Sequence, residues 1–479
     1  MKKVTPKLKN FTIASLKPLF LFVLVVISIN AYKLSCRIDF NVKGLENKKI
    51  FFAYEYGIKE IVLDTIKLDK EGKGFYSSKN RLTGGIYVVV FPNNKYIEFL
   101  INEEQFFTIN SDTSDLFNNI TIEGSEESEL FRQYQVLAKE YENCVKKDQT
   151  LLKKNDTLFG KPVPDKKLVE LRKKMDAFSE KILIERPKSF MAVYLRMQKD
   201  PQVPENLVYK NPELSREFIL NRYKYSKAHY FDNIPFSDIR ILRTRLIFEK
   251  LDHYFNYFIS QDADSLISAM NNVIILSKVN EESLHFTLNF LNINYRNPKN
   301  PSQEKAFVYL ADNYYLDGNS KWADANFLKL LKIKVDNLRT TMIGNTAPDL
   351  ELNASNGKTV KVHDIQSDYL VIYFWSPDCN ECKTETPELF NFYDKYKNKG
   401  LKVIAVYTHT DKEIWNAYLN DHKFDWINAY DPLLKSNFTK LYNVKNIPKL
   451  FLLDKDKRIL AKDINISQLE LLFRKKIKE

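Results

Sequence analysis

The spacing of hydrophobic residues changes twice along the chain and predicts three regions with different secondary structure. Between residues 36 and 125, apolar and polar positions alternate in short runs separated by glycine-containing turns. Such alternation is typical of strands with one buried face, and many short strands in succession predict an antiparallel β sandwich or barrel. The predicted strands cover 37–42, 61–66, 85–91, 96–101 and 106–109.

Between residues 126 and 340 the apolar positions recur every three or four residues, which predicts helices that bury one face. The aromatic residues from Tyr254 to Phe258 follow this spacing, so we interpret them as core residues, with a ligand-binding cluster as the alternative. Cys144 lies in an apolar stripe and is interpreted as a small buried residue. The predicted helices cover 130–145, 168–182, 239–258, 265–276, 304–315 and 322–338.

From residue 343 to 479, strand and helix patterns alternate, which predicts an α/β region with a central mixed sheet. The unbroken apolar run 369–374 is typical of a central strand that is covered on both faces. The last helix is expected at 467–478, with Ser467 as its N-cap. The chain as a whole is therefore predicted to be a multidomain α+β protein. The remaining predicted elements are a helix at 384–399, a strand at 401–407, a helix at 411–421 and a hairpin of 449–454 with 459–461.

The first 31 residues have the composition of a targeting segment. They contain five lysines and no acidic residue, followed by an 11-residue apolar run at 19–29 and the small residue Ala31. That run is shorter than the ~20 residues that a membrane-spanning helix needs. The segment therefore predicts a signal peptide or an N-terminal membrane anchor. Lipid attachment at Cys36 is a third option, although Lys33 stands where a lipobox has an apolar residue.

The composition excludes several classes of protein. With 44% hydrophobic residues the chain can form cores, and four cysteines in 479 residues exclude a disulfide-stapled scaffold. Lysine and arginine exceed the acids by 12, but five of these charges lie in the first 31 residues and the rest are scattered among acids. Nucleic-acid-binding surfaces have basic residues clustered in a patch, and no such cluster is visible in this sequence, so we expect no nucleic-acid partner.

The clearest chemistry lies in a C-x-x-C motif formed by Cys379 and Cys382. A zinc site would need two more ligands, and neither a second cysteine pair nor a closely spaced histidine pair exists. The motif follows a buried strand and opens a helix, where the helix N-terminus stabilises a thiolate. We therefore expect reversible disulfide chemistry with Cys379 as nucleophile and Cys382 as resolving thiol, without a metal or cofactor. The alternative is a static disulfide or two unreactive thiols.

The residues around this pair resemble a known family. Phe374-Trp375-(x)3-Cys379-x-x-Cys382-Lys383-x-Glu385-x-Pro387 is similar to the active site of the thioredoxin superfamily, and in particular of the envelope thiol–disulfide oxidoreductases of the TlpA/ResA type. The stretch 343–349 looks like the start of that domain, and 446–448 looks like its cis-proline loop. The resemblance covers 343–479 and implies a thioredoxin fold there. More weakly, 44–124 and 230–324 resemble the small β domain and the helical region that precede such domains.

The resemblance also implies roles for individual residues. Pro448 is expected to be cis, so that the Ile447 backbone lies beside Cys379 and pairs with substrate. Glu385 corresponds to a proton acceptor for Cys382, with a simple contribution to the helix dipole as the alternative. Trp375 is expected beside the disulfide and, with Pro377, among the substrate-binding residues.

The sequence supports two main hypotheses of function. Asp378 and Glu381 flank Cys379 and disfavour its thiolate, which favours a reductase over an oxidase. The first hypothesis is thus an exported or tethered reductase of disulfide-bonded envelope proteins, among them cytochrome c apoproteins. A membrane thiol donor would return this reductase to its reduced form. The second is an envelope binding module or redox sensor. A thiol peroxidase, in which Ser376 would replace a threonine, is a less favoured alternative.

Overall fold

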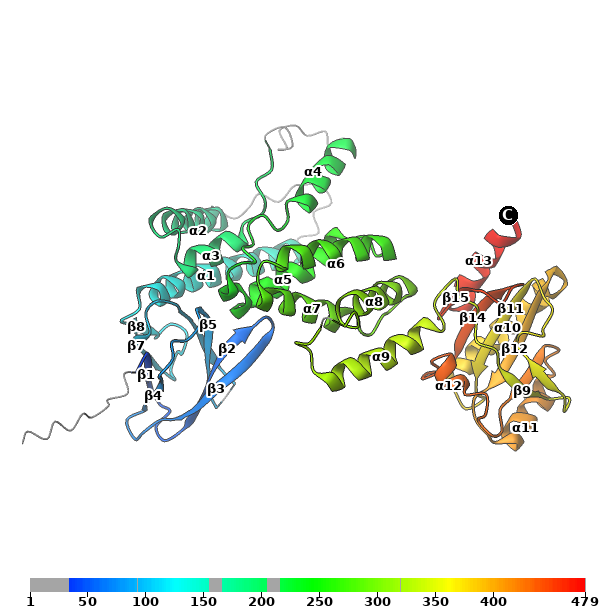
Figure 1. Cartoon of the computed structure of the whole chain (residues 1–479). Coiled ribbons are helices and arrows are strands. Elements are labelled where there is room, and N and C mark those ends of the chain that lie inside the picture. Colours follow the sequence, from blue (N-terminus) through cyan, green and yellow to red (C-terminus); the bar gives the residue numbers. More distant parts are fainter. Residues whose placement is uncertain (1–33, 93, 155–165, 205–215, 319, 479) are drawn as a thin grey trace, which may run out of the picture.

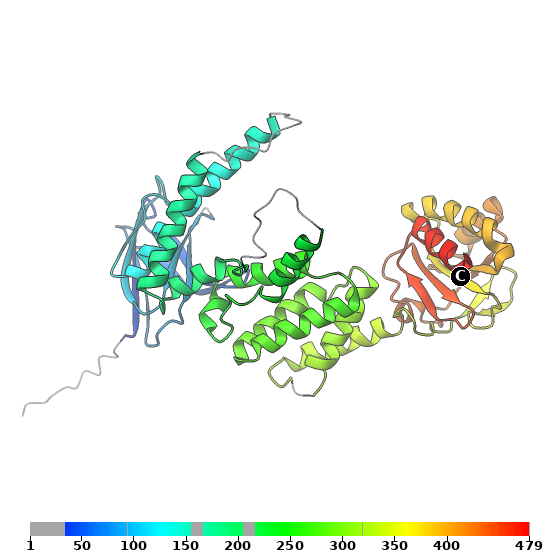
Figure 2. The ribbon, with the colours of Figure 1, turned by 90° about the horizontal axis from the view of Figure 1, so that it is seen from above.

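The computed structural model describes residues 34–92, 94–154, 166–204, 216–318 and 320–478. A β region, a helical region and an α/β region follow one another along an elongated molecule (Figures 1 and 2). The predicted fold class is confirmed, whereas the domain limits 1–31, 36–125, 126–340 and 343–479 stay predictions. The predicted leader 1–31 lies outside the described residues. Among the described helices, none is both long enough and apolar enough to cross a bilayer.

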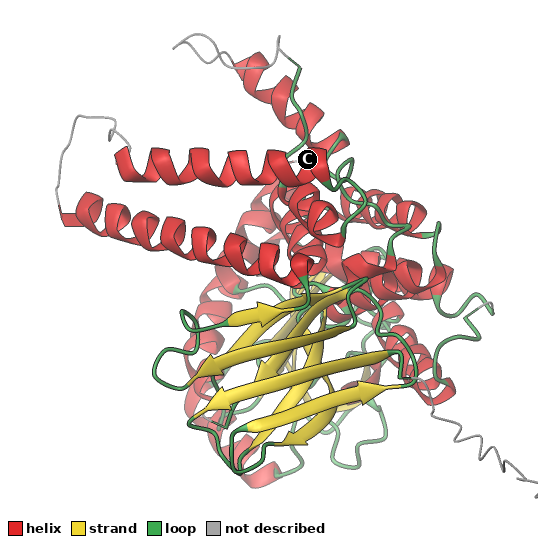
Figure 3. Ribbon diagram, turned by 90° about the vertical axis from the view of Figure 1, so that its left-hand side faces the viewer, coloured by secondary structure: helices red, strands yellow, loops and turns green. Residues whose placement is uncertain are grey.

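The N-terminal region is a sandwich of two four-stranded sheets with the orders β4-β1-β7-β8 and β3-β2-β5-β6. Rings from both sheets fill the space between them, as in the contact of Phe40 with Phe52 at 5.9 Å between centroids. In Figure 3 the strands of this region lie beneath the helices, with one sheet turned towards the viewer. The strands are β1 (Cys36–Lys43), β2 (Lys49–Tyr56), β3 (Lys59–Lys67), β4 (Lys73–Ser78), β5 (Gly85–Val90), β6 (Tyr96–Ile101), β7 (Phe106–Asp112) and β8 (Thr121–Glu123).

One pairing in this sandwich corrects the prediction of an antiparallel fold. Strands β1 and β7 are parallel, with Ile38 opposite Phe107. The chain contributes two pairs of strands to the second sheet, first β2 and β3 and later β5 and β6. After β6 it returns to the first sheet as β7, which runs beside β1 in the same direction. Parallel neighbours need such a long connection, which a local alternation pattern does not reveal.

The helical region packs around one core that runs from the sandwich to the α/β region. Its predicted helix 239–258 is divided into a 3₁₀ turn (Ile239–Arg243), α5 (Arg245–His253) and a π turn (Tyr254–Phe258). Tyr254 and Phe255 are buried as expected, but Tyr257 is exposed, so its assignment to the core is wrong. The other helices are α1 (Glu126–Lys154), α2 (Lys166–Glu185), α3 (Phe190–Gln198), α4 (Arg216–Ala228), α6 (Ala263–Ser277), α7 (Glu281–Tyr295), α8 (Pro301–Tyr314) and α9 (Ala325–Arg339).

The C-terminal region is built on a seven-stranded sheet with the order β10-β9-β13-β12-β11-β14-β15. Apolar cores cover both faces, with helix residues such as Leu389 and Phe473 on one face and Phe438 on the other. The strands are β9 (Glu351–Ala354), β10 (Thr359–Lys361), β11 (Tyr369–Trp375), β12 (Leu401–Tyr407), β13 (Ile427–Tyr430), β14 (Lys449–Asp454) and β15 (Ile459–Lys462), and the helices are α10 (Asn380–Tyr396), α11 (Lys412–His422), α12 (Phe438–Leu441) and α13 (Ile466–Lys478).

The start of α13 corrects the predicted cap. Asn465, not Ser467, precedes the helix, and its side-chain oxygen accepts a hydrogen bond from the backbone N–H of Gln468 at 2.9 Å. The Gln468 side chain accepts in return from the N–H of Asn465 at 3.1 Å. This reciprocal pair is a capping box, in which the cap lies one residue before the helix.

A buried ion pair joins the helical region to the α/β region. Lys462 of β15 donates to both carboxylate oxygens of Glu304 in α8, at 2.6 and 2.7 Å, and both side chains are less than 9% exposed. The hydroxyl of Thr340 donates to the backbone oxygen of Leu441 at 3.0 Å. The α/β region is thus fixed to the end of the helical region (Figure 2).

Candidate redox-active site

The site forms where the central strand β11 ends and α10 begins. The seven residues of β11 are buried on both faces except for the first, so the strand is held firmly up to Trp375. The chain then turns through Ser376 and Pro377, and the N–H of Cys379 donates to the carbonyl of Ser376 at 3.2 Å. Cys379 has extended backbone angles and is the N-cap of α10. The motif therefore lies at a strand–helix junction, as its sequence context predicts.

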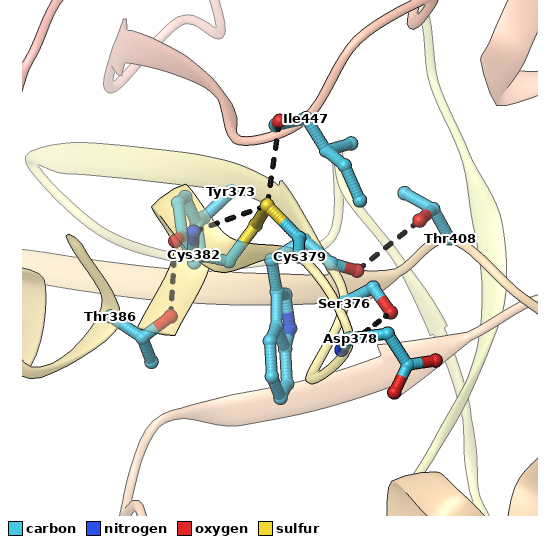
Figure 4. The surroundings of a disulfide bond; sticks show 9 residues. Tyr373, Ser376, Asp378, Cys379, Cys382, Thr386, Thr408 and Ile447 are labelled. Carbon is cyan, nitrogen blue, oxygen red and sulfur yellow. Dashed lines mark hydrogen bonds between the residues drawn. A yellow bond between two sulfur atoms is a disulfide. The ribbon is translucent and has the colours of Figure 1, made fainter. Parts of the chain in front are cut away.

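The two cysteines of the motif form a disulfide bond with their Cα atoms 5.1 Å apart. Cys382 is 1% exposed, whereas Cys379 is only partly buried. The backbone N–H of Cys382 donates to Sγ of Cys379 at 3.1 Å (Figure 4). In the reduced protein this N–H and the helix N-terminus would stabilise negative charge on Cys379.

The loop before β14 lies against the same sulfur. The Ile447–Pro448 peptide bond is cis, so the conformation expected for Pro448 is confirmed. The carbonyl oxygen of Ile447 lies 3.5 Å from Sγ of Cys379 (Figure 4). Both loop residues are partly exposed, so the backbone beside the disulfide is near the protein surface.

Glu385 lies one turn after Cys382 on α10 and is partly buried. Burial, followed by the nearby carboxylates Glu388 and Glu381, raises the pKa of Glu385 to about 6. Residues three apart on a helix share a face, and a carboxyl with this pKa can accept a proton near neutral pH. Glu385 is the sixth helical residue, beyond the first turn where a charge acts on the helix dipole. Both interpretations of Glu385, as a proton acceptor for Cys382 and as a charge near the helix start, stay predictions here.

Two protein families match the chain. Residues 343–462 match the AhpC/TSA family, and residues 32–131 match a domain of unknown function, DUF4369. The thiol–disulfide oxidoreductase ResA of Bacillus thuringiensis (strain Al Hakam) is 31% identical over 123 residues, which are 26% of this chain and 69% of that protein. The chain belongs to the ResA-like thiol–disulfide oxidoreductases. The resemblance inferred from the motif is thus confirmed, and the protein is a protein-disulfide oxidoreductase.

Other similar proteins are known from sequence and structure. A ResA protein of Bacillus cereus is 29% identical over 122 residues, which are 26% of this chain and 69% of that protein. A crystal structure of a thioredoxin-like protein from Bacteroides caccae has 21% identity and a TM-score of 0.45, with 58% of this chain and 97% of that chain covered. A domain of a possible thiol-disulfide isomerase from Cytophaga hutchinsonii has 30% identity and a TM-score of 0.27, with 29% and 96% covered.

Trp375 of this oxidoreductase does not lie where a substrate could touch it. Its side chain is fully buried, and its indole packs against the ring of Tyr418 at 5.0 Å between centroids. Trp375 shares an apolar core with Cys382. A side chain without accessible surface offers no contact to a docking protein, so its predicted substrate-binding role is corrected to packing beneath the disulfide. Pro377, by contrast, is partly exposed at the rim.

Sequence reasoning missed a buried hydrogen bond near the cysteines. The hydroxyls of Tyr373 in β11 and Thr386 in α10 are 3.0 Å apart, and both side chains are fully buried (Figure 4). A tyrosine inside an unbroken apolar strand was the available signal, because a buried hydroxyl needs a partner. The bond ties the strand to the helix that carries Cys382.

The site also bears on the alternative chemistries. Ser376 is fully buried, and its hydroxyl lies 3.4 Å from the N–H of Asp378, which donates to it. Because the whole residue is enclosed, its hydroxyl has no surface that an incoming peroxide could contact. His409 lies exposed after β12. Across the described ranges, no group of three or more His, Cys, Asp or Glu side chains is placed to hold a metal ion.

Proposed function

We propose that the protein is a reductase of protein disulfides in the cell envelope, with Cys379 as nucleophile and Cys382 as resolving thiol. The observation that carries the assignment is the unequal placement of the two sulfurs. Cys379 is partly exposed and accepts the N–H of Cys382, while Cys382 is enclosed. A nucleophile must reach its substrate as a thiolate, whereas a resolving thiol needs only to reach its neighbour.

The reaction proceeds in two exchanges. The Cys379 thiolate attacks one sulfur of the substrate disulfide, forms a mixed disulfide and releases the other substrate sulfur as a thiolate, which takes up a proton. Glu385 accepts the proton of Cys382, whose thiolate attacks Sγ of Cys379. The second substrate sulfur leaves as a thiolate and takes up this proton from Glu385. Two electrons and two protons pass to the substrate, and the enzyme is left with its disulfide. A dithiol donor at the membrane returns it to the reduced form.

The loop 446–448 is proposed to hold the substrate during these exchanges. The Ile447 backbone lies beside Sγ of Cys379 and is partly exposed. An extended substrate segment can add to it through main-chain hydrogen bonds, with Pro448 shaping the loop and the partly exposed Pro377 preceding Cys379. Ile447, Pro448 and Pro377 are thus proposed as substrate-binding residues.

The direction of electron flow is proposed from the charges beside the nucleophile. Asp378 and Glu381 are exposed and carry carboxylates on either side of Cys379. Negative charges destabilise a neighbouring thiolate, and a dithiol that is less stabilised gives up its electrons more readily. These carboxylates oppose the helix N-terminus and favour reduction of the substrate.

The proposed location is the cell envelope. The lysine-rich start and apolar run of residues 1–31 have the composition of an export signal or anchor. The substrates would be disulfide-bonded envelope proteins, with cytochrome c apoproteins as one class, and the donor a membrane thiol protein. Residues 1–31 would provide a tether if they are retained.

Trapping tests the proposal. Cys382→Ser should hold substrates on Cys379 as mixed disulfides that dithiothreitol releases, and the Cys379→Ser variant serves as the matched control because it should capture nothing. The wild-type protein should catalyse reduction of insulin by dithiothreitol. An absence of both capture and catalysis contradicts the function, and a redox potential near about −120 mV, the value of a strong oxidant, contradicts the direction.

A further inference from the structure

We propose that Leu433 and Leu434 form an apolar subsite that binds the substrate segment next to the reacting disulfide. The inference rests on the proposed exchange at Cys379 and adds a preference among its substrates. The two leucines lie in the loop 431–437, which connects β13 to α12. They are 66% and 54% exposed.

Strand register places this loop at the same edge of the sheet as the disulfide. Trp375 pairs with Tyr407, and Tyr407 pairs with Tyr430. Strands β11, β12 and β13 are parallel, so each ends at this level. The chain continues from β11 into the cysteine motif and from β13 into the leucine loop. Two strand spacings separate these ends, which is about 10 Å.

The loop is built to hold the leucines outward. The Asp431 side chain is 6% exposed and accepts the N–H of Ser436 at 2.7 Å. The carbonyl of Asp431 accepts the N–H of Leu434 at 3.3 Å. Leu434 has a φ of 51°, a left-handed conformation that glycine adopts freely and a leucine does not. An apolar side chain kept in a strained and exposed position indicates a functional role.

The occupant that fits best is an extended segment of the substrate. Two leucine side chains are far too small for a stable contact between two copies of the chain, which needs about 1,000 Å² of buried surface. A substrate that is linked covalently to Cys379 needs only a weak additional contact. An extended chain advances about 3.3 Å per residue, so a span of about 10 Å corresponds to three residues. The subsite therefore favours an apolar residue three positions from the attacked cysteine.

A pair of disulfide peptides tests this preference. The peptides have one intramolecular disulfide and differ only in a leucine or a serine three residues from a cysteine. The reduced full chain should act on the leucine peptide with a KM about 10-fold lower and an unchanged kcat, because docking precedes the chemistry. Leu433→Ser and Leu434→Gly should reduce this ratio to about 3-fold or less. Leu434→Gly is the more decisive variant, since glycine suits the backbone there and the fold should keep its stability.

Controls separate this proposal from the proposed function. Leu471 on α13 is 59% exposed, similar to the two loop leucines. Leu471→Ser therefore removes an equally exposed leucine elsewhere and should leave the preference for the leucine peptide unchanged. The small substrate 2-hydroxyethyl disulfide should be reduced equally by all these variants. A wild-type chain without the preference, an unchanged preference in both loop variants, or an equal loss in Leu471→Ser overturns the subsite. If Leu433→Ser changes the oligomeric state of the protein but not its preference for the leucine peptide, the leucines form a contact between two copies of the chain and the subsite is overturned. If the wild type reduces neither peptide nor the small disulfide, the proposed function itself fails and the subsite with it.

Discussion

Cys36 in the sandwich and Cys379 in the α/β region show how differently one side chain behaves in two regions of the molecule. Cys36 begins β1, is fully buried in the sandwich core, and burial raises the pKa of its thiol to about 11. Cys379 is partly exposed and has a backbone N–H directed at its sulfur. The local backbone, rather than the residue type, thus decides which thiol can react. Burial in the core also disfavours the lipidation alternative for Cys36.

The largest effect should come from removing the reactive sulfur. Cys379→Ser should lower disulfide exchange at least about 1,000-fold, because no other thiol is placed to attack a substrate. The measurement is insulin reduction by the full chain. Cys36→Ala is the matched control and should keep activity within about two-fold of wild type. If Cys379→Ser and Cys36→Ala lost similar amounts of activity, the distinction between a reactive Cys379 and an unreactive Cys36 would be wrong.

The next effect concerns Glu385, the proposed proton acceptor for Cys382. Glu385→Gln should slow exchange about 10- to 100-fold above pH 6, and the rate should lose its rise between about pH 5 and 7. The folded-state pKa of about 6 lies above the ordinary value of 4.5, so the folded state holds this proton more tightly than the unfolded one. Stability from Glu385 is thus fully present below pH 4.5 and is lost as the pH rises through 6.

Thermal unfolding checks this sign independently of activity. Glu385→Gln should unfold at a higher temperature than wild type at pH 7.5, and at a similar temperature at pH 4. Glu388→Gln keeps the Glu385 carboxyl but removes one of the charges that raise its pKa, so the rise in rate should move to slightly lower pH while the rate above pH 7 stays that of wild type. An unchanged rate profile in Glu385→Gln would assign that carboxyl no role in proton transfer.

A smaller effect is expected where Cys36 is replaced by a polar residue of similar size. Cys36→Ser places a hydroxyl in the sandwich core and should lower the free energy of unfolding by about 1–3 kcal/mol. Urea denaturation measures this change. Exchange activity in the folded variant should equal that of wild type, and a stability unchanged within error would mean that Cys36 is not enclosed.

The smallest effect should follow from the two carboxylates beside the nucleophile. Asp378→Asn combined with Glu381→Gln should raise the redox potential by about 20 mV and lower the pKa of Cys379, because each removed charge contributes a few tenths of a kcal/mol at an exposed position. Equilibration with glutathione measures the potential. A shift to a lower potential would contradict the proposed origin of the reductase direction.

The sequence predicted the parts of the α/β region that depend on local pattern. The run 369–374 and the C-x-x-C motif located the central strand and the helix that Cys379 caps. The cis bond at Pro448 was expected only from family resemblance, since nothing local distinguishes it from an ordinary proline. Trp375 shares a core with Cys382, but its full burial depends on packing against Tyr418 of α11, a distant residue that the local pattern does not reveal.

Elements outside that motif were missed for identifiable physical reasons. Helix α7 buries residues around most of its circumference, so it has no clear apolar stripe. Strand β4 has no buried residue, and its sequence Lys-Gly-Phe-Tyr-Ser-Ser does not alternate between apolar and polar residues. The exposed loop at 431–437 has no periodic pattern, and its significance depends on the register that aligns Tyr430 with Tyr407. Pairings between distant strands and the buried ion pair of Glu304 with Lys462 are set by tertiary packing.

Residue-resolved alkylation of the fully reduced chain tests the central claim most directly. Iodoacetamide is added at pH 7, and mass spectrometry follows each of the four cysteines in the folded protein. Cys379 should react first, with Cys382 slower because it is enclosed, and Cys36 should stay unmodified, since with a pKa of about 11 only about one thiol in ten thousand is ionised. Faster modification of Cys36 or Cys382 than of Cys379 would contradict the account.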